Sequence, residues 1–140
     1  MGSLDPELKR LYEAIQGKLQ TMRDHQQKKT KLVESRHQLG AQKNENELVR
    51  NELNHLEPGA NVYKLIGPAL VQQSEHDAKT IIEKRIEYIG GEISRIERQI
   101  EEADKAEESE RNGIIDLQKK MNERHQSMQA QAAAQQQQQQ

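Results

Sequence analysis

The segment from Ile86 to Met128 carries apolar residues at alternating steps of three and four, and this repeat constrains the fold more than any other feature. Stepping from Ile86 in this way reaches thirteen positions, of which ten are apolar. These positions are Ile86, Ile89, Ile93, Ile96, Ile100, Ala103, Glu107, Glu110, Ile114, Leu117, Met121, Arg124 and Met128. A repeat of 3.5 residues keeps one stripe of a helix against a partner helix. The sequence therefore predicts a long helix within a coiled coil.

Start and stop signals divide the rest of the chain. Asp5 can cap a first helix, with Pro6 at its first position, and Pro58-Gly59 ends it. Ser74 can cap the second helix, because Asp77 follows three residues later as in a capping box. The tail QAQAAAQQQQQQ is of low complexity, with nothing to bury. The predicted organisation is a flexible N-terminus (1–4), a single domain (5–128) containing helix 5–56, a β-hairpin (61–73) and helix 74–128, and a disordered tail (129–140).

The composition suits an elongated molecule. Apolar residues make up 32% of the chain, against about 45–50% in ordinary soluble domains, and there is no Trp or Phe. The net charge of -2 comes from interleaved charges of both signs, so no basic field points to nucleic acid. No apolar run is long enough to span a membrane. The absence of Cys fits a reducing compartment, so we expect a cytoplasmic protein.

Between the two helices lies NVYKLIGPALVQQ, residues 61–73. Gly67-Pro68 is a turn dipeptide between two runs of branched residues, which predicts a strand-turn-strand hairpin. Alternation places Val62 and Ile66 on one face and Tyr63 and Leu65 on the other. An isolated two-stranded hairpin is marginally stable in water and exposes two edges. We therefore expect hairpins from several chains to pair into a barrel or sandwich.

Two helices of similar length joined by a short insert favour an antiparallel pair. If Leu56 lies near Ser74, the numbers of facing residues add to about 130. Under that rule the basic residues Arg23, Lys28, Lys29 and Lys31 face the acidic segment Glu101–Glu110. Opposite charges at the same level of the helix pair fix the register of the two helices more than they add to stability. An accidental match between two solvated faces is the alternative.

The same packing places both chain ends at one tip, with an apolar cluster. A single layer of two helices cannot cover every side of these residues, so we expect the tip to be adhesive. An ordinary coiled-coil seam is the alternative interpretation. The cluster consists of Leu8, Leu11, Tyr12, Ile15, Ile114, Leu117, Met121 and Met128.

The sequence carries no pattern of residues for catalysis. Neither a Walker nor a GxGxxG phosphate-binding loop occurs, and the five His residues form no i,i+4 pair that would chelate a metal. Carboxylates on exposed helices have nothing to shift their pKa into the range of general acid–base catalysis. We expect two helices and a hairpin to form no pocket. The sequence thus predicts no enzyme, no cofactor and no metal.

The hairpin NVYKLIGPALVQQ followed by IIEKRIEYIGGEISRIERQI resembles the beta-type subunits of prefoldin, over about residues 8–126. The resemblance implies a hetero-hexameric, ATP-independent co-chaperone of alpha- and beta-type subunits, whose hairpins form a double barrel. It also implies that the coiled-coil tips hold unfolded proteins, such as actin and tubulin, for delivery to the cytosolic chaperonin. The assembly residues that it implies are Val62, Tyr63, Leu65, Ile66, Leu70 and Val71, and the client-binding residues are those of the tip cluster.

Two other functions are compatible with parts of the sequence. A structural coiled coil, acting as a tether or scaffold with the hairpin as a mere connector, remains the alternative. A nucleic-acid binder that uses the segment Arg23–Lys31 is disfavoured, because the facing acidic residues cancel its charge.

Overall fold

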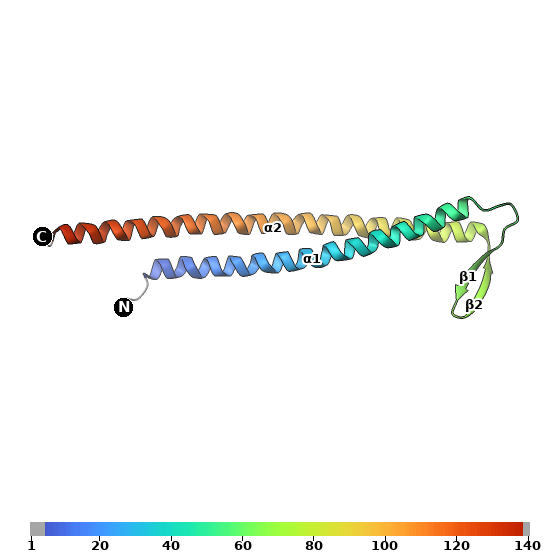
Figure 1. Ribbon diagram of the computed structural model, residues 1–140, viewed down its shortest axis with the longest axis horizontal. Coiled ribbons are helices and arrows are strands. Elements are labelled where there is room, and N and C mark those ends of the chain that lie inside the picture. The colour runs from blue at the N-terminus through green and yellow to red at the C-terminus, as the bar shows by residue number, and fades with distance from the viewer. Residues whose placement is uncertain (1–4, 139–140) are drawn as a thin grey trace. The chain divides into compact units, whose positions relative to one another are not determined.

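A computed structural model describes residues 5–138 of the chain. Its elements are α1 (Pro6–Asn54), β1 (Val62–Ile66), β2 (Ala69–Gln73) and α2 (Glu75–Gln138) (Figure 1). The predicted fold, two long helices with one antiparallel hairpin between them, is confirmed. The predicted flexible N-terminus, residues 1–4, lies outside the described residues, as do residues 139–140 of the predicted tail.

The predicted caps form at the start of both helices. The backbone N–H of Leu8 donates to Asp5 Oδ2 at 3.2 Å, and that of Asp77 donates to Ser74 Oγ at 3.0 Å. These bonds satisfy donors that have no partner within the helix. Gly59, at φ 86°, turns the chain after α1, in a backbone region where glycine is favoured.

The C-terminal end of α2 differs from the prediction. The helix continues to Gln138, whereas the sequence predicts its end at residue 128 and a disordered tail from residue 129. Ala and Gln are strong helix formers, and no Pro or Gly follows Gly113 to stop the helix. Low complexity indicated that the tail has nothing to bury, and the structure agrees, because residues 129–138 are exposed.

The described residues fall into two compact units, each built from a part of α1 and a part of α2. Unit 1 combines residues up to Thr30 with those from Glu101 onward, and unit 2 is Lys31–Ile100. Unit 2 contains the hairpin. The two units are described separately below.

The predicted seam of α2 is confirmed in both units. Each of its thirteen positions is buried or partly buried. No side chain of the described residues is exposed by less than 2%, as expected for a single layer of two helices. The most buried residues are Leu53, Ala78, Ile82, Ile89 and Ile96 in unit 2, and Leu8, Ile15, Ala103 and Ile114 in unit 1.

The seam of α1 follows the same heptad but contains many polar side chains. Counting steps of three and four from Leu8 reaches Leu11 and Ile15, and then Lys18, Met22, His25, Lys29, Leu32, Arg36, Leu39, Lys43, Asn46, Arg50 and Leu53. Apart from Arg36, all are at least partly buried. The rule that facing residue numbers add to about 130 also predicts that Val33 pairs with Ile96 and Leu48 with Ile82. These two pairings are wrong, because Val33 and Leu48 are exposed.

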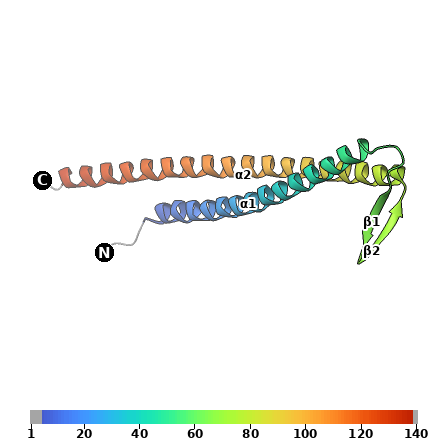
Figure 2. The ribbon, with the colours of Figure 1, turned by 45° about the vertical axis from the view of Figure 1, so that its right-hand side comes forward.

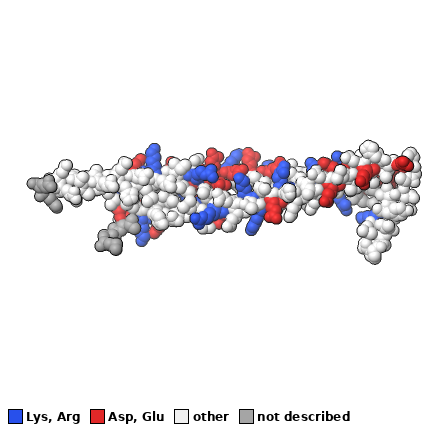
Figure 3. All heavy atoms as spheres, viewed as in Figure 1, with Lys and Arg blue, Asp and Glu red and all other residues white. Residues whose placement is uncertain are grey.

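Ion pairs connect several of these polar positions of α1, and the capping residue Asp5, to α2. In unit 1, Arg124 Nη2 lies 3.0 Å from Asp5 Oδ1, Lys18 Nζ lies 3.4 Å from Glu110 Oε2, and Lys29 pairs with Asp104. In unit 2, Arg36 pairs with Glu97 at 2.7 Å and Arg50 with Glu83 at 3.6 Å. The residue numbers of every pair add to about 130, as predicted. Figure 3 shows that charged side chains of both signs are interspersed along the helices.

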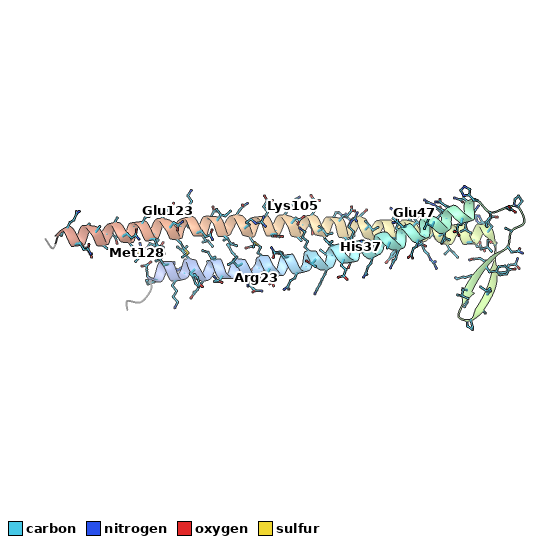
Figure 4. The ribbon with its side chains drawn as sticks, viewed as in Figure 1. Arg23, His37, Glu47, Lys105, Glu123 and Met128 are labelled. Carbon is cyan, nitrogen blue, oxygen red and sulfur yellow. The ribbon has the colours of Figure 1, made fainter. Side chains whose placement is uncertain are left out.

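The predicted facing of a basic and an acidic segment is confirmed for one of its four basic residues. Lys29 meets Asp104, and this hydrogen bond raises the pKa of the Lys29 amine. Arg23, which is labelled on α1 in Figure 4, is exposed and forms no ion pair with a described residue. The neighbouring contacts come from residues that the prediction did not include, namely Lys18 and Gln26.

The two strands pair in one register, with Val62 opposite Gln73 and Leu65 opposite Leu70. Gly67, at φ 57°, and Pro68 form the two-residue connection, and a positive φ at the first loop residue suits a tight hairpin. The predicted hairpin is therefore confirmed. In the two views of Figures 1 and 2, it leaves the side of α2 and does not continue along the axis of the helix.

Candidate functional site

The hairpin is held at its base and exposed beyond it. Val62 packs against the buried cluster of Leu53, Ala78 and Ile82 at the end of the helix pair. The other candidate assembly residues expose between 47% and 69% of their surface; they are Tyr63, Leu65, Ile66, Leu70 and Val71. The described chain therefore covers one of the six and leaves five uncovered.

These exposed side chains occupy both faces of a two-stranded sheet. Tyr63, Leu65 and Leu70 share one face by alternation and register, while Ile66 and Val71 lie on the other. Each strand also has an outer edge that pairs with no other strand among the described residues. Free main-chain edges beside exposed apolar side chains form a template for strand pairing with another chain. The assignment of these residues to subunit contacts stays a prediction.

The structure divides the eight residues of the tip cluster into three groups, all in unit 1. Leu8, Ile15 and Ile114 are buried in the seam, which fits the alternative interpretation for these three. Tyr12 is 56% exposed. The other four are partly buried: Leu11, Leu117, Met121 and Met128, the last of which is labelled on α2 in Figure 4.

Sequence reasoning missed Ile115, which is 53% exposed in unit 1. The sequence could have indicated this exposure, because the residue directly after the seam residue Ile114 points away from the seam. Tyr12 has the same relation to the seam residue Leu11. Both are large apolar side chains that the helix pair leaves more than half exposed.

The heptad places Tyr12 and Ile115 on one side of unit 1. With seam positions written a and d, Tyr12 is at e and Ile115 at b, next to e on the helix surface. Lys29 at a pairs with Asp104 at e, so the e sides of the two helices adjoin in this unit. Leu19, also at e, is partly buried. We call Tyr12, Leu19 and Ile115 the Tyr12 surface.

The prediction that no pocket forms is wrong for unit 2, although the hollows there are open. One of them has a volume of about 560 Å³ and lies where Gly40 of α1 and Gly90 of α2 leave the flank of the helix pair without side chains. The guanidinium of Arg36, at its rim, is already bound by Glu97. Among the described residues that line this hollow, no hydrogen bond connects the Ser94 hydroxyl to the His37 imidazole.

The pKa shifts in the chain have structural causes. A hydrogen bond from Arg124 lowers the pKa of the Asp5 carboxyl, and the same bond raises the pKa of Arg124. Among residues 5–138, no three His, Asp or Glu side chains come together as metal ligands would. No helix within the same residues is both long and apolar enough to cross a membrane.

Comparison with known proteins agrees with this architecture. A family model described as "Prefoldin subunit" matches residues 16–139. Prefoldin subunit 6 of Homo sapiens is 33% identical over 108 residues, covering 77% of this chain and 84% of that protein. Probable prefoldin subunit 6 of Caenorhabditis elegans is 34% identical over 124 residues, covering 89% of this chain and 92% of that protein. Prefoldin subunit 6 of Arabidopsis thaliana is 44% identical over 77 residues, covering 55% of this chain and 60% of that protein.

A solved structure extends the agreement to the fold. The crystal structure of the prefoldin beta subunit from Thermococcus strain KS-1 matches with a TM-score of 0.68, covering 81% of this chain and 94% of that one. Its identity to this chain is 20%, so this match concerns the fold alone. The family model covers well over half of the chain, and the residues that it matches include the hairpin and the whole of α2. The chain therefore belongs to the prefoldin subunit family.

Proposed function

We propose that this chain is one subunit of a hetero-hexameric, ATP-independent co-chaperone in the cytoplasm. In this proposal, it assembles with other alpha- and beta-type prefoldin subunits through its hairpin and binds unfolded proteins, such as actin and tubulin, through unit 1. The complex then delivers its clients to the cytosolic chaperonin. The observation that carries the proposal is the hairpin, whose apolar side chains the chain itself leaves exposed.

Assembly through the hairpin is supported by what it presents. Five exposed apolar residues on two faces, beside unpaired strand edges, would favour uncontrolled association if they stayed in water. Pairing with strands of other subunits satisfies the edges and buries the side chains in one step. Val62 anchors the base of the hairpin to the helices and thereby positions the strands for such pairing.

Client binding by unit 1 is supported by a surface that the seam does not use. The Tyr12 surface offers apolar contact without opening the helix pair. The partly buried Met121 and Met128 have flexible thioether side chains, which adapt to apolar partners of varied shape. We therefore assign client contact to these exposed and partly buried residues, and assign Leu8, Ile15 and Ile114 to holding the helices together.

The first test is stoichiometry. The chain is co-expressed with alpha-type and other beta-type prefoldin subunits, and the product is weighed by native mass spectrometry. We expect a complex of six chains that contains one copy of this chain. A monodisperse homodimer that does not join such a complex would contradict the proposal and favour the structural tether.

The second test addresses the client surface in the assembled complex. The variant Tyr12→Glu, Ile115→Glu is expected to assemble normally, because both side chains are exposed on the helix pair. It should suppress the aggregation of denatured actin about tenfold less well than the wild type. Leu48→Glu is the matched control, because Leu48 is an exposed apolar residue of α1 outside this surface. Equal protection by the double variant and the wild type would show that clients bind elsewhere.

A further inference from the structure

A strip of apolar side chains continues from the hairpin onto the helices of unit 2. It consists of Val62 and Tyr63 in β1, Val49 in α1, and Ile81 and Tyr88 in α2, and we call it the Tyr88 strip. Ile81 and Tyr88 are seven residues apart, so they lie on the same face of α2, one above the other. Tyr88 is 70% exposed, about as much as Leu65 and Leu70 of the hairpin.

Two adjoining hollows make this strip continuous. The first, about 150 Å³, lies beside the base of the hairpin and is lined by Val49, Val62, Tyr63 and Ile81, among others. The second, about 410 Å³, lies along α2 and is lined by Ile81, Tyr88 and Ile89, with Gln42 of α1. Ile81 and Arg85 line both hollows. A partner seated on the hairpin therefore has an apolar path onto the helices.

Positive charge borders the second hollow. Lys84 and Arg85 line it, and neither forms an ion pair with another residue of the described chain. An apolar hollow with two cationic side chains at its border fits an apolar side chain accompanied by carboxylates. An exposed aromatic residue beside Arg has the composition of an interface hot spot.

We propose that the Tyr88 strip is a second assembly contact, on which the neighbouring subunit of the complex places an apolar side chain flanked by carboxylates. This inference rests on the proposed assembly through the hairpin. The strip begins at Val62 and Tyr63, within the hairpin. A subunit that pairs with β1 is therefore the molecule placed to contact the rest of the strip. The contact fixes the angle between subunits, which strand pairing alone leaves free to twist.

The test places a photoreactive benzoylphenylalanine at position 88 and irradiates the purified complex. The expected result is a crosslink to one specific neighbouring subunit. The same group at position 48 is the control, because Leu48 is exposed on α1 but does not line either hollow. Native mass spectrometry of the same sample shows whether the complex has formed. A formed complex with no crosslink from position 88 to a subunit overturns the inference and leaves the proposed assembly intact.

The other outcomes are equally decisive. Crosslinking of position 88 to a bound client, to the chaperonin or to a second copy of this chain overturns the inference. Charge reversal gives an independent reading: Lys84→Glu, Arg85→Glu should speed dissociation of this chain from the complex about tenfold at low salt, and less at high salt. Circular dichroism should remain unchanged, because both side chains are exposed. Unchanged dissociation of this variant at both salt concentrations also counts against the inference.

Discussion

Ile89 and Ile96 of α2 are 8% and 7% exposed, whereas Leu65 and Leu70 of the hairpin are 69% and 68% exposed. All four are branched apolar residues in regular secondary structure within unit 2. The isoleucines lie at heptad positions that α1 covers. The leucines lie on a sheet of only two strands, which has no second layer to cover it.

This difference separates the interactions that fold the chain from those that join it to others. Burial of apolar surface stabilises by about 25 cal/mol per Å², so the seam gains this stabilisation within one chain. The hairpin gains it only when another molecule covers it. Substitutions in the seam should therefore change folding, and substitutions in the hairpin should change assembly.

The largest effect is expected for charges in the hairpin. Leu65→Glu, Val71→Glu places one carboxylate on each face of the sheet, where a partner strand would have to desolvate it. Incorporation into the hexamer, measured by native mass spectrometry after co-expression, should fall at least about 100-fold. Helix content of the isolated chain, measured by circular dichroism, should be unchanged because both residues are exposed.

The control for this experiment is a charge on the base of the same hairpin. Val62→Glu faces the cluster of Leu53, Ala78 and Ile82, and it should reduce both stability and incorporation. Normal incorporation of the Leu65, Val71 double variant would show that the exposed faces are not the assembly surface.

The next effect in size is expected in the seam. Ile96→Ala removes a buried side chain between the helices and should lower the free energy of unfolding by about 2–4 kcal/mol. Leu70→Ala, the matched change in the hairpin, should lower it by less than about 0.5 kcal/mol. Urea denaturation of the full chain measures both. Similar losses for the two variants would mean that the hairpin is covered within the isolated chain.

The helices also differ in how well the sequence predicts them. The seam of α2 could be read directly because its positions are mostly Ile, Leu and Met. The seam of α1 could not, because Lys18, Lys29 and Arg50 fill positions where hydrophobic periodicity expects apolar residues. These side chains are partly buried and pair with carboxylates of α2, and the pairing becomes visible only when the two helices are aligned.

The candidate sites show the same limit. The hairpin was predictable, because a Gly-Pro turn between branched runs specifies it locally, with the positive φ of Gly67 at the turn. Tyr12 was predicted within the apolar tip cluster, but Ile115 was not, because its exposure follows only from its place beside the seam residue Ile114. The helical conformation of residues 129–138 was missed because low complexity outweighed the helix propensity of Ala and Gln.

A smaller effect is expected from glycines within the helices. A Cβ added at Gly91 would meet no atom within 4 Å, so Gly91→Ala should raise the free energy of unfolding by about 1 kcal/mol. Gly113→Ala is the contrast, because its Cβ would lie 3.0 Å from Cε of Lys18, the residue that pairs with Glu110. The free energy of unfolding should therefore rise less for Gly113→Ala than for Gly91→Ala. Equal increases in urea denaturation would indicate that the Lys18 side chain moves aside at no cost in stability.

The smallest effect is expected at the start of α1, where Asp5 accepts hydrogen bonds from the Leu8 N–H and from Arg124. The bond from Arg124 lowers the pKa of the Asp5 carboxyl in the folded chain. The stabilisation that this hydrogen bond gives to the folded chain is therefore complete above the unfolded pKa of about 3.9. It is lost as the pH falls through the lower pKa of the folded chain.

Asp5→Asn keeps an acceptor for the Leu8 N–H but removes the charge, so this variant should be slightly less stable than the wild type at neutral pH. In thermal unfolding, this difference should shrink as the pH falls below about 4, and also in about 1 M salt, because the pair is only partly buried and salt screens it. A difference that persists under both conditions would show that the carboxylate charge is not its source, and that the loss comes from a weaker cap.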